Sequence, residues 1–162
     1  MTASNEYIFV SHWRVESTIE EVSEVLNNAP GLTRWWPSVY LRVKQAEPGG
    51  TVELLTKGWL PYKLHWFFRV TETRLPHGFS IEAWGDLEGR GEWSFLQDGR
   101  FVNITYDWRI RAEKPLLRSL SFLLKPLFRA NHRWAMARGE ESLKAELGRR
   151  AGAGQQSARQ TS

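Results

Sequence analysis

One stretch of the chain, residues 128–147, constrains the fold more than any other. Seven residues there share one helical stripe: Phe128, His132, Ala135, Met136, Gly139, Leu143 and Leu147. Spacings of three and four positions are typical of one face of an α-helix. The stripe is apolar except for His132, and Gly139 leaves room for a backbone or a ligand to approach closely. Because a long helix must bury such a face, we expect it to lie across a sheet.

The chain before this helix is rich in alternating apolar and polar residues, which is typical of β-strands. Ser17 and Glu20 form a capping box that predicts a short helix, and a second short helix or turn ends at Pro37. The Gly-rich residues 84–91 predict a turn. Seven strands are expected, at about residues 7–15, 39–45, 51–57, 63–73, 79–83, 93–95 and 101–111.

The C-terminal part is expected to form two helical segments, about 115–124 and 126–148, because Pro126 favours a kink or break between them. Residues 149–162 contain Gly, Ala, Gln, Ser and Arg without an apolar period, so we expect a disordered tail. We find neither an internal repeat nor a linker within residues 1–148, which predicts a single domain there.

Composition excludes several classes of protein. The 162 residues contain no cysteine, so disulfides and thiolate metal sites are excluded. No apolar run is long enough to span a membrane, and the N-terminal residues do not resemble a signal peptide, so we expect a cytoplasmic protein. No metal-binding or phosphate-binding motif occurs, and the four histidines are scattered. We therefore expect no metal and no cofactor.

Positive charge is concentrated near the C-terminus, in a chain with a pI of about 9.6. Residues 115–139 contain five basic residues and no acidic one, and Arg118, Lys125, Arg129 and Arg133 share one side of the helical wheel. A solvated helix face accounts for this pattern. The alternative is a weak peripheral contact with anionic lipid. No recognition motif supports nucleic-acid binding, and the pattern leaves monomer and homodimer open.

The order of strand, two short helices, six strands and long helix resembles the SRPBCC superfamily, the START-like helix-grip group. Three local motifs carry this resemblance, which is strongest to the polyketide cyclase/dehydrase and lipid-transport branch: residues 35–37 (WWP), residues 85–89 (GDLEG), and Asn131-His132 before Met136 and Gly139. The resemblance implies an α+β fold, in which a curved antiparallel sheet of about seven strands wraps around a long C-terminal helix. It also implies a deep hydrophobic cavity between the two.

Four residues are candidates for catalysis. His132, on an apolar stripe, could act as a general acid or base, or be a core histidine that makes one hydrogen bond. Asp86 and Glu88 could form an acid–base pair if both were buried, or could hydrogen-bond to nearby backbone in a turn. Tyr106 could orient a ligand carbonyl, although a tyrosine at such a position more often belongs to the core.

Nine tryptophans are too many for one small core, so we expect several of them to line the cavity. The candidate ligand-binding residues are Trp35, Trp36, Trp66, Phe68, Trp84, Trp93, Tyr106, Trp108, His132 and Met136. We expect a cavity of several hundred Å³ that binds a hydrophobic or aromatic, lipid- or polyketide-like molecule. The alternative is an enzyme of the cyclase, dehydratase or hydrolase type that works without a metal.

Overall fold

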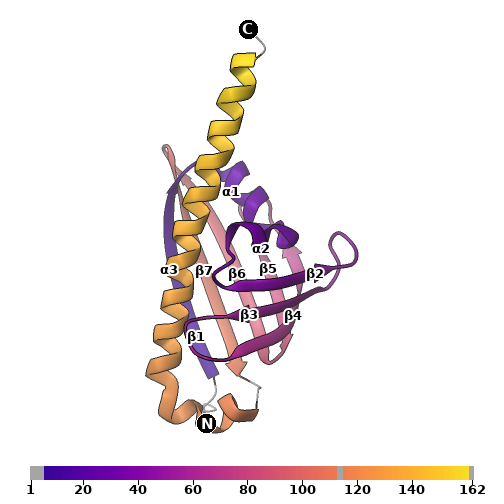
Figure 1. Cartoon of the computed structure of the whole chain (residues 1–162), viewed down its shortest axis with the longest axis vertical. Coiled ribbons are helices and arrows are strands. Elements are labelled where there is room, and N and C mark those ends of the chain that lie inside the picture. The colour runs from indigo at the N-terminus through magenta and orange to yellow at the C-terminus, as the bar shows by residue number, and fades with distance from the viewer. Residues whose placement is uncertain (1–5, 113–114, 161–162) are drawn as a thin grey trace.

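The computed structural model describes residues 6–112 and 115–160, apart from the side chains of 112–124 and 153–160. Strands and helices follow the expected order (Figure 1). They are β1 (Glu6–Glu16), α1 (Ile19–Leu26), the 3-10 helix η1 (Ala29–Gly31), α2 (Leu32–Trp35), β2 (Tyr40–Gln45), β3 (Val52–Lys57), β4 (Lys63–Thr73), β5 (Gly78–Gly85), β6 (Leu87–Asp98), β7 (Phe101–Ala112) and α3 (Pro115–Gln160).

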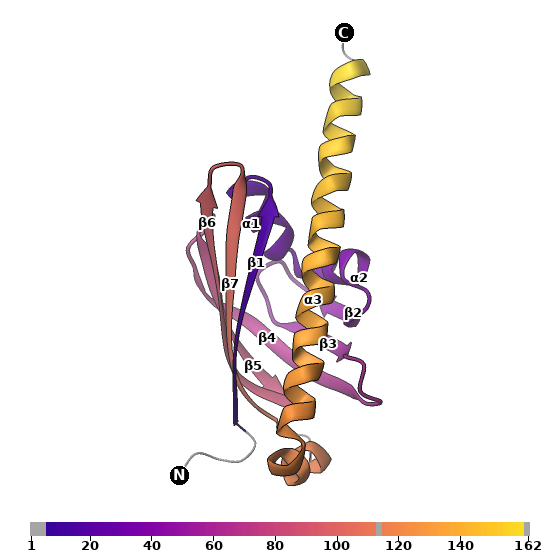
Figure 2. The same cartoon turned by 90° about the vertical axis from the view of Figure 1, so that its left-hand side faces the viewer.

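The seven strands form one antiparallel sheet in the order β1-β7-β6-β5-β4-β3-β2. β2 to β7 follow one another as hairpins, and α1, η1 and α2 carry the chain from β1 at one edge to β2 at the other. The sheet is curved, and α3 runs along its open side (Figure 2). This arrangement confirms the predicted α+β helix-grip fold.

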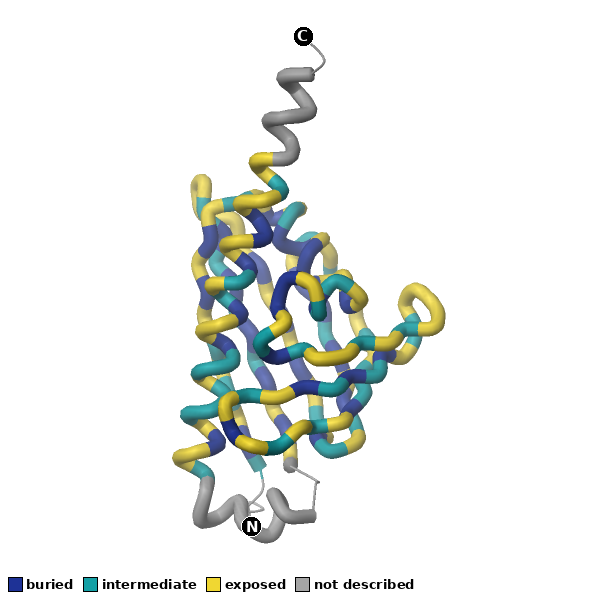
Figure 3. Tube along the Cα trace, in the orientation of Figure 1, coloured by how far each residue is buried: buried dark blue, intermediate teal, exposed yellow. Residues whose placement is uncertain are grey.

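The core lies between the concave face of the sheet and the helices. Buried and exposed positions alternate along the strands (Figure 3), as the apolar period predicts. α3 buries Phe128, Met136, Leu143 and Leu147 of the predicted stripe. Gly139 is also buried, and a Cβ at this position would overlap the indole ring of Trp36. The close approach predicted at this glycine is therefore made by a side chain of the core.

Several local predictions need correction. Thr18, not Ser17, is the N-cap of α1 and accepts a hydrogen bond from the N–H of Glu21. Residues 84–91 are not an open turn, since only Asp86 separates β5 from β6. α3 continues through Pro126 as one helix and is not broken into two segments there. Figure 2 shows that the start of α3 is bent away from its long axis. Residues 149–160, expected in a disordered tail, continue α3 beyond the sheet in Figure 1.

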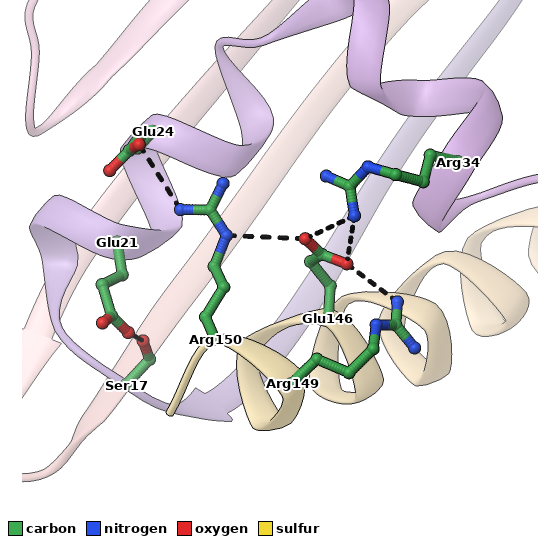
Figure 4. A network of polar contacts seen from close by, with 7 residues as sticks. All are labelled: Ser17, Glu21, Glu24, Arg34, Glu146, Arg149 and Arg150. Atoms are coloured by element: carbon green, nitrogen blue, oxygen red, sulfur yellow. Dashed lines mark hydrogen bonds and ion pairs between the residues drawn. The ribbon is translucent and has the colours of Figure 1, made fainter. Parts of the chain in front are cut away.

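A buried carboxylate ties α3 to the short helices (Figure 4). The side chain of Glu146 is only 3% exposed, and both of its oxygens lie 2.8 Å from Nη1 of Arg34 in α2. Arg149 donates to it at 2.8 Å, and Arg150 bridges from Glu146 to Glu24 of α1. Burial opposes ionisation of Glu146, but the hydrogen bonds from Arg149 and Arg34 outweigh it and lower the pKa.

Within the described residues, no helix combines the length and the apolar character that a membrane-spanning segment requires.

Candidate functional site

A cavity of about 140 Å³ lies between α3 and the concave face of the sheet. It is smaller than the several hundred Å³ expected from the sequence. All four tyrosines of the chain belong to its wall. The lining residues are Tyr7, Phe9, Trp36, Val39, Tyr40, Thr56, Lys57, Gly58, Tyr62, Leu64, Trp66, Leu87, Tyr106, Trp108, Ile110, Phe128, Asn131, His132, Ala135 and Met136.

Aromatic side chains of the sheet take up much of the space that the curvature creates. Trp93 stacks on Tyr106 with ring centroids 4.0 Å apart, and Tyr106 stacks on Trp108 at 5.7 Å. Gly91 permits this row, because a Cβ there would lie 2.8 Å from the ring of Trp108 and 3.0 Å from that of Tyr106. The excess of aromatic residues therefore contributes as much to filling the concave face as to lining a cavity.

Six of the ten candidate ligand-binding residues line the cavity: Trp36, Trp66, Tyr106, Trp108, His132 and Met136. The other four lie elsewhere. Trp35 is buried in α2 against Trp36, and Trp93 lies behind Tyr106. Phe68 faces a separate groove beside α1. Trp84 follows the inward-facing Ala83, so strand alternation places it on the outer face, where it stacks on Phe67 at 5.9 Å.

His132 is the titratable group of α3 in the cavity wall. Its ring stacks on Phe9 of β1, with centroids 4.0 Å apart and planes 19° apart. Its Nε2 is buried and has no hydrogen-bond partner among the described residues. Burial disfavours the imidazolium and lowers the pKa of His132 to about 4. At neutral pH the ring is therefore uncharged and presents Nε2, a polar atom that a ligand could satisfy.

The carboxylates of Asp86 and Glu88 do not line the cavity. Asp86 accepts a hydrogen bond of 2.8 Å from the backbone N–H of His65, and Glu88 pairs with Arg111 at 3.2 Å. Both therefore take structural roles at the junction of β5 and β6. Among the described residues, no carboxylate lies in the cavity wall, so His132 lacks an acidic partner there.

The tyrosines supply the other polar groups. Burial raises the pKa values of Tyr40 and Tyr106, and the proximity of the two phenols raises that of Tyr106 further. Burial also raises the pKa of Tyr62, to about 12, and Tyr7 adds to this shift. All three hydroxyls therefore stay protonated at neutral pH and can donate to a ligand oxygen. Of the tyrosines in the cavity wall, only Tyr106 was identified as a candidate from the sequence. Tyr7 could also have been identified, because the alternation of the first strand places it at an inward position.

The loop between β3 and β4 closes one side of the cavity. Oδ1 of Asn131 in α3 accepts a hydrogen bond from the N–H of Leu60 at 3.3 Å. Gly58 lies so close to this amide that a Cβ would overlap it. The ring of Tyr62 packs edge-on against Phe128, with centroids 6.2 Å apart. Asn131 was noted in the sequence only as the neighbour of His132, and its contact with this loop depends on the tertiary fold.

The described residues contain no group of three or more histidine or acidic side chains that could hold a metal ion. The polar side chains that line the cavity are a histidine, tyrosines, a threonine, an asparagine and a lysine. Thr56 already accepts a hydrogen bond from Nε1 of Trp66 at 2.9 Å. This set is suited to hydrogen bonding with an uncharged ligand.

Neither a known family profile nor a curated protein sequence matches this chain. Solved structures do match it in fold. A protein from Thermus thermophilus is 16% identical with a TM-score of 0.69, over 86% of this chain and 99% of the other. The Zhui aromatase/cyclase from a Streptomyces species is 16% identical with a TM-score of 0.69, over 90% of this chain and 96% of the other.

A norcoclaurine synthase point mutant from Thalictrum flavum, solved with a transition-state analogue, is 12% identical with a TM-score of 0.58, over 87% of this chain and 95% of the other. At these identities the likeness concerns the fold. It agrees with the helix-grip arrangement of sheet and helix described above, and with the resemblance noted in the sequence.

Proposed function

We propose that this protein binds a small hydrophobic or aromatic molecule between α3 and the sheet. The observation that carries the proposal is a largely aromatic cavity lined by His132, whose Nε2 has no hydrogen-bond partner among the described residues. A cavity of this kind supplies apolar contacts over most of a ligand and fixes its orientation through a few polar groups. The phenols of Tyr40 and Tyr106 and the imidazole of His132 are those groups.

The volume narrows the class of ligand. An apolar cavity of about 150 Å³ binds one benzene ring, and the cavity here is about 140 Å³. It therefore suits a single ring, or a ring-sized part of a larger lipid- or polyketide-like molecule. A hydroxyl or carbonyl on that ring would meet His132 or a tyrosine, so phenols are the most suitable first probes.

Catalysis of the cyclase or dehydratase type is the second candidate. The fold shared with an aromatase/cyclase and with norcoclaurine synthase supports it. The geometry favours binding instead, because acid–base work needs two positioned groups and neither Asp86 nor Glu88 lines the cavity. A base with a pKa of about 4 is also weak at neutral pH.

A cavity-filling substitution tests the proposal. Ala135 lines the cavity, whereas Ala137 lies exposed on the same helix. Titration of the wild type with p-cresol should change its tryptophan fluorescence, because Trp36, Trp66 and Trp108 border the site. Ala135→Phe should weaken binding by at least about tenfold, a loss of about 1.4 kcal/mol. Ala137→Phe should bind as the wild type does, and equal binding by all three proteins would refute the site.

Native mass spectrometry of the protein purified from its own host identifies the natural ligand. A co-purifying molecule that is retained by Ala137→Phe and absent from Ala135→Phe would assign it to this cavity.

A further inference from the structure

Two segments far apart in the sequence form one surface beside the cavity. The β3–β4 loop contacts α3 through Gly58 and Leu60, both of which pack on Asn131. Leu127 lies one helical turn before Asn131 on the same side of α3. The loop and these turns of α3 therefore present their outward side chains next to one another.

Two large apolar side chains are exposed on this surface. Trp59 in the loop is 45% exposed, and Leu127 is 39% exposed. The neighbouring Leu60 is only 8% exposed, so the loop buries the smaller apolar side chain and leaves the tryptophan outside. A single exposed apolar residue is ordinary on a protein surface. Positive charge lies beside these two residues as well.

Two exposed lysines, Lys57 and Lys63, flank the loop that carries Trp59, and we name them the basic rim. Lys57 and Lys63 lie directly opposite each other in the β3–β4 ladder. Like charges at opposed positions destabilise a sheet. Neither lysine forms an ion pair with a carboxylate among the described side chains. By contrast, Arg69 and Glu82, which also lie opposite each other on neighbouring strands, form an ion pair.

We infer that this surface docks on an anionic lipid bilayer. Phosphate groups would neutralise the opposed lysines, and basic residues close to such a surface are attracted to it. Tryptophan favours the boundary between headgroups and acyl chains, so Trp59 and Leu127 would enter that layer. An acidic protein could also satisfy the charges. The exposed Trp59 and Leu127 beside the lysines favour a bilayer over an acidic protein.

The docking surface shares residues with the cavity wall. Lys57 of the basic rim lines the cavity together with Gly58 and Asn131, and Gly58 directly precedes Trp59. Docking would therefore place one wall of the cavity against the membrane, where apolar molecules are concentrated. This consequence rests on the proposed binding function, whereas docking itself does not.

Vesicle sedimentation with the full chain tests docking without any ligand. The wild type should bind phosphatidylcholine vesicles that contain about one third phosphatidylglycerol, and binding should weaken between about 50 mM and about 500 mM salt. Lys57→Glu/Lys63→Glu should reduce binding by at least about tenfold, and Trp59→Ser should reduce it on anionic vesicles in high and low salt alike. Circular dichroism is used to check that each variant is folded. If the glutamate variant does not fold, Lys57→Gln/Lys63→Gln removes the same positive charges without adding negative ones.

The matched control is Arg42→Glu/Lys44→Glu, which makes the same change in charge on the exposed residues of β2. This control should bind vesicles as the wild type does. An equal loss in the control would show that net charge alone acts and would overturn the proposal. The proposal would also be overturned if the wild type did not bind anionic vesicles but was retained by an immobilised acidic protein through Lys57 and Lys63. Because no ligand is present, a failure of ligand binding in the cavity leaves this result unchanged.

Discussion

The imidazole of His132 lies almost parallel to the ring of Phe9, with the two ring centroids 4.0 Å apart. This contact joins the middle of α3 to β1 and holds the imidazole in an apolar environment. The ring therefore resists protonation, and its Nε2 is left without a partner among the described residues. The same residue thus couples the stability of the fold to pH and offers the cavity a polar group.

The first prediction concerns that coupling. The pKa of His132 is about 4 in the folded protein, below its ordinary value of 6.5. Its stabilising contribution is therefore complete above pH 6.5 and is lost as the pH falls towards 4, because the unfolded chain takes up the proton first. Between pH 7.5 and pH 5 the loss is about 2 kcal/mol. Urea unfolding should show this loss of unfolding free energy in the wild type and not in His132→Phe. Parallel pH profiles for the two proteins would contradict the burial of this ring.

The second prediction separates binding from catalysis. If His132 only orients a ligand, His132→Asn should keep the affinity for p-cresol within about tenfold, or about 1.4 kcal/mol, because the amide still offers hydrogen bonds. Isothermal titration measures this directly. Turnover of an aromatic polyketide or an ester by the wild type, abolished in a folded His132→Asn, would instead establish the enzyme.

A third prediction compares two glycines of α3. Gly139→Ala should destabilise the protein by about 1–3 kcal/mol, because the added methyl group would overlap Trp36 in a filled core. Gly148→Ala has no atom within 4 Å of the new methyl group. It should stabilise the protein by about 0.5–1 kcal/mol, since alanine favours a helix. Urea unfolding of both variants distinguishes the two sites, and a stabilised Gly139→Ala would show that Trp36 does not pack there.

The fourth prediction concerns the carboxylate of Glu146. Glu146→Gln should cost about 1–3 kcal/mol at pH 7, because the hydrogen bonds from Arg34 and Arg149 lose their charged acceptor. Since the folded pKa is lowered, this contribution is present above pH 4.5 and disappears as the pH falls through the folded value.

The matched control is Glu141→Gln, which removes an exposed ion pair with Arg138 from the same helix. It should change the free energy of unfolding by less than about 0.5 kcal/mol. Equal effects at the two positions would show that burial adds nothing to the network in Figure 4.

The order of the elements and the inward face of most strands were predictable from the sequence, because both depend on local periods. Alternation correctly placed Trp66, Tyr106 and Trp108 inside, and the stripe through Met136 and Leu143 identified the buried face of α3. The same alternation, applied strictly, would also have placed Trp84 outside. The Gly-rich residues after it suggested a turn and obscured that signal.

Only the tertiary structure decided how much space remains inside and what surrounds it. Whether an inward aromatic fills or lines the concave face depends on sheet curvature and on neighbours distant in the sequence, as Trp93 behind Tyr106 illustrates. The pairing of Asn131 with Leu60 joins residues 71 positions apart, and no local pattern encodes such a contact. A period in the sequence specifies which way a side chain points, whereas the volume of a cavity is set by the packing of all the elements around it.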